Sequence, residues 1–209
     1  MDAFSQDFRD QFQNLLAWRR DVRRFRTDPV DEALLMQCLD TFRLAPSVGL
    51  SEPWRVVRVQ SATMRTKAIE NYQTANAKAL DGYTGEKAEL YAGLKLSGMQ
   101  EAPEHIAVFC DDATSKGSGL GATTMPEMRR YSVVGAVNLM WLMARSLGLG
   151  MGWVSILDAP KLSADLGVPE DWSLIAYLCI GWPEENSTTP ELQTKGWETR
   201  QTALNIETR

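Results

Sequence analysis

Apolar residues recur at helical spacing along four stretches of the chain. A repeat of three to four residues places them on one side of a helix, so each stretch is predicted to form a helix with a buried face. The stretches are 7–19, 31–44, 63–80 and 127–147. The last is apolar around most of its circumference, which predicts that it lies at the centre of the fold.

Shorter stretches show the alternation, or the continuous apolar run, that is typical of β-strands. They are 54–59, 105–111, 149–156 and 174–181, with a short helix predicted near 161–166. Helices come first, and strands mixed with helices follow, without the strict alternation of a doubly wound parallel sheet. This order predicts one α+β domain that spans residues 1–209.

Two segments have no strong period. Residues 81–102 are polar and contain several glycines, so we expect a mobile cover over a site. Residues 183–209 are polar and extended, with little core of their own. Such a tail often packs on a partner subunit, and we expect the same here.

The composition limits the class of protein. A net charge of -5 argues against general nucleic-acid binding, which usually needs a basic surface. The acidic start of the chain lacks the apolar core of a signal peptide, and no apolar run reaches the roughly 18 residues of a membrane span. These features predict a cytoplasmic protein that binds neither membrane nor nucleic acid.

The cysteine and histidine content excludes some kinds of site. The three cysteines are odd in number and far apart, which predicts small core residues in a reducing compartment; they are Cys38, Cys110 and Cys179. Because His105 is the only histidine, a His-rich metal centre is excluded. Its place beside a predicted buried strand favours a structural role, and we predict no metal site.

Arg19, Arg20 and Arg23 place three guanidinium groups within five residues. Planar guanidinium groups can donate paired hydrogen bonds to phosphate oxygens, which makes this cluster a candidate phosphate clamp. The alternative is a solvated basic patch that closes a helix, where cations also favour the helix dipole. The residues alone favour neither interpretation.

Asp21 stands between these cations and is a candidate general base or orienting acceptor. Its neighbours are expected to favour the ionised carboxylate. The alternative is a local ion pair with Arg23 or Arg24, and the residues alone favour that alternative.

Three small residues lie in candidate ligand-binding segments. Ser155 follows a glycine-rich strand, where glycine permits a flat ligand to approach the main chain. The alternative, a strand serine with a satisfied hydroxyl, is favoured by sequence alone. Ser47 and Gly49 lie in a loop between helix and strand, a common location for binding, although ordinary turn chemistry also explains them. The glycine-rich stretch 115–124 lacks the lysine of a phosphate-binding loop, which indicates a surface loop.

Five segments together resemble the nitroreductase-like flavoproteins, and more narrowly their 5,6-dimethylbenzimidazole synthase branch. The segments are RRDVRRF at 19–25, APSVGLSEPW at 45–54, GLKLSGMQEAP at 93–103, GLGMGWVSI at 148–156 and PELQTKGWETR at 190–200. They occur in family order and cover nearly the whole chain beyond the first dozen residues. RRDVR, APSVG and GWVSI in combination are far more specific than any one of them.

The resemblance implies an intertwined homodimer that binds FMN at the subunit interface, with a central mixed or antiparallel sheet flanked by helices. It assigns cofactor contacts to Arg19, Arg20, Asp21, Val22, Arg23, Ser47, Gly49, Leu96, Ser155 and Arg200. The arginines would hold the phosphate and ribityl chain, with Arg200 assisting from the tail. Ser47 and Gly49 would contact the isoalloxazine ring from the other subunit, and Leu96 belongs to the covering segment.

By the same resemblance, Asp21 and Ser155 occupy the catalytic positions near the reactive face of the ring. The implied reaction is the O2-dependent fragmentation of reduced FMN to 5,6-dimethylbenzimidazole, the lower ligand of vitamin B12, and erythrose 4-phosphate. A separate flavin reductase would supply the reduced FMN. Glu52 departs from the family, which commonly has Gln before the Pro-Trp pair.

Two other functions remain open. A conventional NAD(P)H-dependent nitroreductase or flavin reductase would need an open flavin face and would tolerate replacement of Asp21. A flavin-binding protein without turnover would bind FMN tightly and release no aromatic product.

Overall fold

A four-stranded antiparallel sheet forms the centre of the computed structural model, which describes residues 3–94 and 97–209. The strands are β1 (Trp54–Arg58), β2 (Glu104–Asp111), β3 (Gly150–Val154) and β4 (Trp172–Gly181). Their order across the sheet is β1-β2-β4-β3, and every neighbouring pair is antiparallel. The long strand β4 therefore lies inside the sheet, while β3 lies at its edge.

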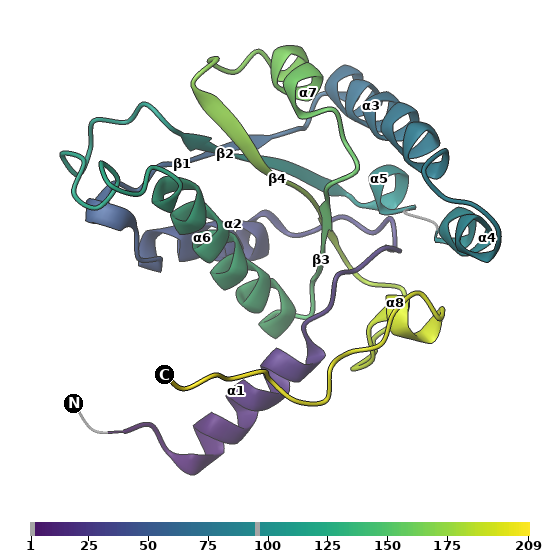
Figure 1. Cartoon of the computed structure of the whole chain (residues 1–209), viewed down its shortest axis with the longest axis horizontal. Helices are drawn as coiled ribbons and strands as arrows, with labels where there is room; N and C mark the ends of the chain where they lie inside the picture. Colours follow the sequence, from purple (N-terminus) through teal and green to yellow (C-terminus); the bar gives the residue numbers. More distant parts are fainter. Residues whose placement is uncertain (1–2, 95–96) are drawn as a thin grey trace.

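Helices cover both faces of this sheet (Figure 1). They are α1 (Gln6–Trp18), α2 (Glu32–Asp40), α3 (Ala62–Leu80), α4 (Glu86–Gly93), α5 (Gly98–Glu101), α6 (Met128–Ser146), α7 (Ala159–Leu166) and α8 (Glu191–Thr194). One face packs against α2 and α6, and the other against α3 and α7. The predicted α+β class is confirmed. Helix α6 packs in the core under the sheet, but its buried residues fall on one side of the helix, between Ser132 and Ala144.

The alternation of side chains along β2 explains the two layers. Ile106 and Val108 belong to the core under α6, whereas Ala107 and Phe109 belong to the core under α3 and α7. Successive side chains of a strand point to opposite faces, so a continuous apolar run fills two cores at once. The cysteines are free and buried, as predicted.

Three segments differ from the elements that the sequence predicted. The helix expected over 31–44 ends at Asp40 and continues as a 3-10 turn over Thr41–Leu44. The polar segment 81–102 contains α4 and α5, and the tail contains the short helix α8. Weak periodicity hid these helices because they are short and lie largely at the surface.

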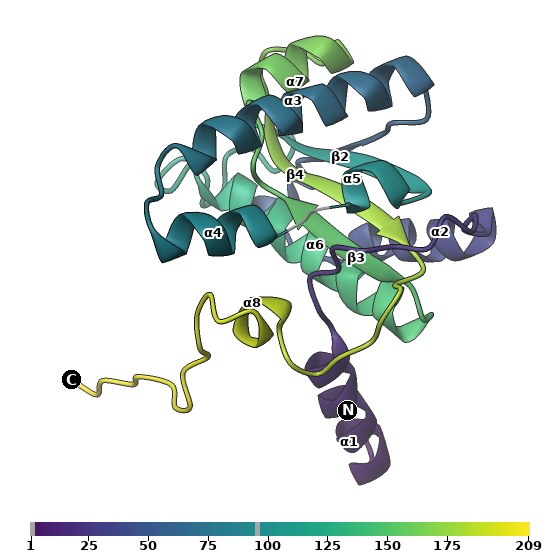
Figure 2. The ribbon, with the colours of Figure 1, turned by 90° about the vertical axis from the view of Figure 1, so that its right-hand side faces the viewer.

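Helix α1 and the C-terminal tail extend away from the body (Figure 2). No residue of α1 is buried. Among the residues that the structure describes, no helix is long and apolar enough to cross a membrane.

Candidate functional site

The arginine segment runs beside β3 at the edge of the sheet. The main-chain N–H of Val22 donates to the carbonyl of Met151 at 3.1 Å, and Asp21 pairs with Met151 as a parallel bridge. A Cβ atom at Gly152 would lie 2.3 Å from the carbonyl oxygen of Val22. Glycine is therefore needed in β3 for the arginine segment to approach this closely.

This contact brings together the two candidate catalytic positions. One carboxylate oxygen of Asp21 accepts a hydrogen bond from the main-chain N–H of Trp153 at 2.9 Å. The other lies 3.8 Å from Nε of Arg23. Ser155 follows two residues after Trp153, just beyond the end of β3. The local ion pair that the sequence favoured is therefore present, but the closer hydrogen bond joins Asp21 to β3.

The pKa of the Asp21 carboxyl group is raised. Burial is the largest cause, and it outweighs the Trp153 hydrogen bond and the charges of Arg23 and Arg19, which lower the pKa. The cationic neighbours favour the ionised carboxylate, as predicted, but desolvation disfavours the charged form more strongly. The side chain still exposes 42% of its surface. Asp21 therefore has an accessible carboxyl group that is more basic than an ordinary aspartate.

Ser155 is exposed. Its carbonyl accepts from the main-chain N–H of Leu157 at 3.0 Å, which turns the chain directly after the strand. Within the described parts of the chain, its hydroxyl makes no hydrogen bond, in contrast to the satisfied strand serine that sequence alone favoured.

The three arginines have different surroundings. The Arg19 guanidinium lies 4.8 Å from the ring centre of Trp141. The Arg20 guanidinium donates to the main-chain carbonyls of Ala17 and Thr188, and so joins the end of α1 to the tail. Arg23 is mostly buried, with 13% of its side chain exposed.

A cavity of about 280 Å³ opens beside this segment. It is lined by residues of the arginine segment and of the tail: Arg20, Asp21, Val22, Arg23, Arg24, Glu185, Ser187, Thr189, Glu191, Thr194 and Lys195. Four cationic residues and three acidic residues therefore line one space. The described residues contain no group of three His, Cys, Asp or Glu that could hold a metal ion.

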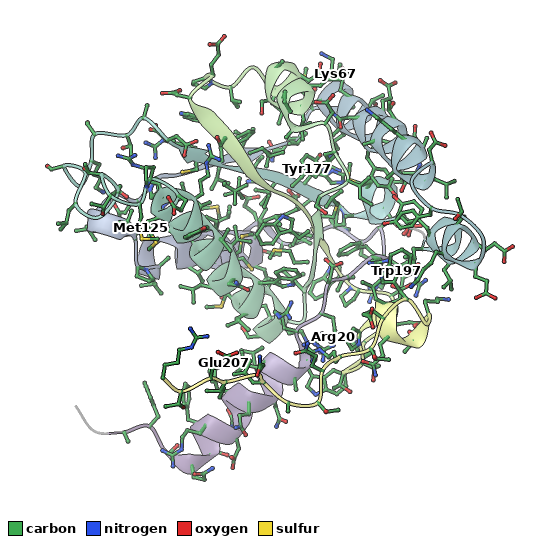
Figure 3. The ribbon with its side chains drawn as sticks, viewed as in Figure 1. Arg20, Lys67, Met125, Tyr177, Trp197 and Glu207 are labelled. Carbon is green, nitrogen blue, oxygen red and sulfur yellow. The ribbon has the colours of Figure 1, made fainter. Side chains whose placement is uncertain are left out.

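The tail brings a further cation to this region. The pKa of Arg20 is lowered, first by burial and then by the charges of Arg200 and Arg19. Arg200 therefore lies near Arg20, although 180 residues separate them in the sequence. Figure 3 shows Arg20 at the end of α1 beside the tail.

Ser47 and Gly49 lie elsewhere in the same chain. The N–H of Val48 donates to Oγ of Ser132, near the start of α6, whereas Nε1 of Trp141 donates to the carbonyl of Arg20. Nine residues of helix separate those two anchors, a length of about 14 Å at 1.5 Å per residue. Within one chain, the residues predicted to contact the cofactor therefore form two separate groups, one in the arginine segment and one around Ser47 and Gly49. Leu96 lies outside the described residues.

The glycine-rich stretch 115–124 has a role that the sequence did not predict. Gly49 has φ of +57°, and a Cβ there would lie 2.8 Å from the carbonyl oxygen of Leu120. A Cβ at Gly117 would lie 2.4 Å from the carbonyl oxygen of Gly49. The stretch therefore packs against the segment that carries Ser47 and Gly49. The sequence does not show which glycines have positive φ. The high density of glycines in this stretch could have indicated close packing of the main chain.

The tail supplies another set of residues that sequence reasoning missed. Trp197 lies with its ring centre 5.4 Å from that of Tyr83 and 6.3 Å from that of Tyr91. Nζ of Lys87 lies 4.6 Å from the Trp197 ring centre and donates to the Trp197 carbonyl at 2.8 Å. The tail is thereby attached to α4 and to the loop before it. The aromatic residues in these otherwise polar segments were the signal.

The antiparallel sheet with helices on both faces and a cationic edge segment defines a nitroreductase-type fold. The family model described as "Nitroreductase family" matches residues 16–182. Among solved structures, iodotyrosine deiodinase bound to FMN and 3-iodo-L-tyrosine has a TM-score of 0.75 at 19% identity, covering 94% of this chain and 99% of that chain. A BluB-like flavoprotein from Clostridium difficile 630 has a TM-score of 0.67 at 20% identity, covering 86% and 93%.

Two curated relatives indicate the group within this family to which the chain belongs. A 5,6-dimethylbenzimidazole synthase of Rhodospirillum rubrum is 51% identical over 94% of this chain and 93% of its own length. A 5,6-dimethylbenzimidazole synthase of Rhodobacter capsulatus is 44% identical over 93% of this chain and 94% of its own length. The chain belongs to the nitroreductase family and, within it, to the group of these synthases.

Proposed function

We propose that this chain uses O2 to fragment reduced FMN into 5,6-dimethylbenzimidazole and erythrose 4-phosphate. The observation that carries the proposal is the 51% identity to a synthase of that name over 94% of the chain. The hydrogen bond from Trp153 to Asp21 supports the proposal. It attaches a carboxyl group with a raised pKa to β3, and the bonded residue, Trp153, precedes Ser155 by two positions.

The residues at the cavity fit an FMN phosphate. Arg20, Arg23 and Lys195 face the cavity, and the charge of Arg200 acts on Arg20. Nε of Arg20 is buried without a hydrogen-bond partner among the described residues, which leaves one donor of this guanidinium unused. In this proposal Arg19, Arg20, Arg23 and Arg200 hold the phosphate and ribityl chain, with Val22 beside them. Bound reduced FMN supplies both the electrons for O2 and the ring that becomes the product.

Asp21 and Ser155 perform the chemistry of this proposal. Asp21 accepts and relays a proton, and its raised pKa makes the ionised carboxylate a stronger base than an ordinary aspartate. Trp153 fixes the carboxyl group through its main-chain N–H. The exposed Ser155 hydroxyl donates a hydrogen bond near the reactive edge of the ring and so favours fragmentation over release of H2O2.

Residues 81–102 are the cover in this proposal. Two contacts attach the segment beside the site: the N–H of Gly98 donates to the carbonyl of Arg23 at 2.8 Å, and Trp197 packs against Tyr83 and Tyr91. A cover held at both ends would exclude water and nicotinamide from the flavin. Leu96 belongs to it by resemblance alone. A separate reductase then has to supply reduced FMN.

We further propose that the working form is a homodimer. One face of α1 and its flanks exposes large apolar side chains: Phe4, Phe8, Phe12, Leu16 and Trp18. Leu204 and Ile206 of the tail are also largely exposed. Apolar surface of this extent usually marks a subunit interface. A second copy would also supply Ser47 and Gly49 to the arginine segment of the first, with residues 183–209 packed on the partner.

The test is to mix the purified protein with chemically reduced FMN, admit air and analyse the products by chromatography and mass spectrometry. We expect 5,6-dimethylbenzimidazole. Reoxidation of the flavin without that product would overturn the proposal. Consumption of NAD(P)H with a nitroaromatic acceptor would then identify a nitroreductase, and tight FMN binding without turnover would identify a flavin-binding protein.

A further inference from the structure

A buried amide on α3 holds the segment that follows Ser155. Asn71 is 3% exposed, and both polar atoms of its side chain bond to one residue. Its Nδ2 donates to the carbonyl of Asp158 at 2.9 Å, and its Oδ1 accepts from the main-chain N–H of Asp158 at 2.8 Å. A primary amide can satisfy a donor and an acceptor of the same residue at once, as this pair requires.

Asp158, which Asn71 binds through these two hydrogen bonds, lies three residues beyond Ser155. The Ser155 carbonyl accepts from the N–H of Leu157, so the chain turns between the strand and Asp158. The Asp158 side chain then accepts from the N–H of Lys161 and caps α7. The turn is therefore fixed by β3 at one end and by Asn71 and the capped helix at the other. Ser155 is exposed within it and makes no side-chain bond of its own to the described residues.

Other side chains cannot replace this amide without loss. An aspartate at position 71 would keep an acceptor for the Asp158 N–H but would present oxygen instead of a donor to the Asp158 carbonyl. A serine would reach at most one of the two groups. Because buried main-chain groups without partners are costly, either change is expected to move the turn.

We propose that Asn71 is a positioning residue for the Ser155 hydroxyl. It acts on the reaction through its two hydrogen bonds to Asp158. This inference rests on the proposed function. Asn71 itself need not touch the flavin. Hydroxyl placement matters because a displacement of about 1 Å at a reacting centre can cost roughly a hundredfold in rate.

The experiment compares Asn71→Asp, Ser155→Ala and the double variant with the wild type, each as a full-length protein given reduced FMN and air. The readout is 5,6-dimethylbenzimidazole formed per flavin oxidised, with H2O2 measured in parallel. We expect Asn71→Asp to lower this ratio about tenfold or more while affinity for oxidised FMN changes by less than about threefold. The double variant should lose no more than Ser155→Ala alone, because both changes remove the same hydroxyl effect.

Thr74→Ala is the matched control. Thr74 lies one helical turn further along α3. Among the described residues, its hydroxyl bonds only to the Glu70 carbonyl of the same helix. It should leave the product ratio unchanged. If Asn71→Asp does not fold, as judged by circular dichroism, Asn71→Ser is measured in the same way with the same expectation.

The outcomes distinguish failure of the positioning role from failure of the proposed function. A wild-type protein that yields no product overturns the proposed function before any variant is compared. Wild-type product with an unchanged ratio in a folded Asn71 variant overturns the positioning role alone. So does a double variant in which the two losses multiply, since Asn71 would then act independently of Ser155.

Discussion

Replacing Asp21 separates a proton-transfer role from a structural one. In Asp21→Asn, an amide oxygen can still accept the Trp153 N–H, which now bonds the carboxylate at 2.9 Å. The change removes the charge and its partly exposed pair with Arg23, worth less than about 1 kcal/mol. In Asp21→Ala the Trp153 N–H loses its acceptor, at a cost of about 1–3 kcal/mol if it stays unpaired. We therefore expect urea denaturation to show near wild-type stability for Asn and a clear loss for Ala.

Both variants should lose product formation. General acid–base catalysis contributes about 10²–10⁴-fold, which corresponds to roughly 3–5 kcal/mol in the barrier. The assay measures 5,6-dimethylbenzimidazole from reduced FMN and air, beside titration of FMN binding by fluorescence. We expect FMN binding by Asp21→Asn to survive. Wild-type product from that variant would refute the proton role, whereas loss of FMN binding would show that Asp21 only shapes the pocket.

Three further predictions concern pH, the tail and the dimer. Burial, and then the charge of Arg65, lowers the pKa of His105 from 6.5 to about 4, so between these values the unfolded chain binds a proton that the native protein does not. On acidification the wild type should lose roughly 3 kcal/mol of unfolding free energy that His105→Gln does not lose, measured by urea titration; equal losses would contradict this. Trp197→Ala should weaken the attachment of the tail to α4 by about 1–3 kcal/mol and speed proteolysis of the tail, with little change in the melting temperature; an unchanged cleavage rate would argue against the attachment. Phe12→Glu should raise the dimer dissociation constant about tenfold or more in sedimentation experiments and weaken FMN binding with it; an unchanged constant would exclude this face of α1 from the interface.

The sheet and the central helix were predictable because local patterns encode them. The continuous apolar run of β2 fills two cores, and the apolar residues of α6 recur at helical spacing on the side that packs in the core with α2. Short surface helices such as α4 carry no such signal. Their stability comes from contacts like that of Tyr91 with Trp197, which join segments far apart in the sequence.

Sequence motifs select candidate residues for the site but do not reveal their geometry. Motifs selected Asp21 and Ser155, but the bond from Trp153 to Asp21 spans 132 positions. The net effect on the Asp21 pKa depends on burial, which no neighbouring residue in the sequence reveals. Asn71 lies in no motif, and its role follows only from the packing of α3 against the start of α7.

Glu52 shows how the structure accommodates a departure from the family pattern. A free carboxylate near a reduced flavin would disfavour the anionic ring through like-charge repulsion. Here the Glu52 carboxylate pairs with Nζ of Lys116, which lies in the glycine-rich stretch packed against Gly49. The main-chain N–H of Glu52 donates to Oγ of Ser47 at 3.0 Å, a contact that does not depend on the side chain at position 52. The ion pair offsets the added charge while the backbone bond preserves the Ser47 turn, so glutamate at this position is compatible with the proposed function.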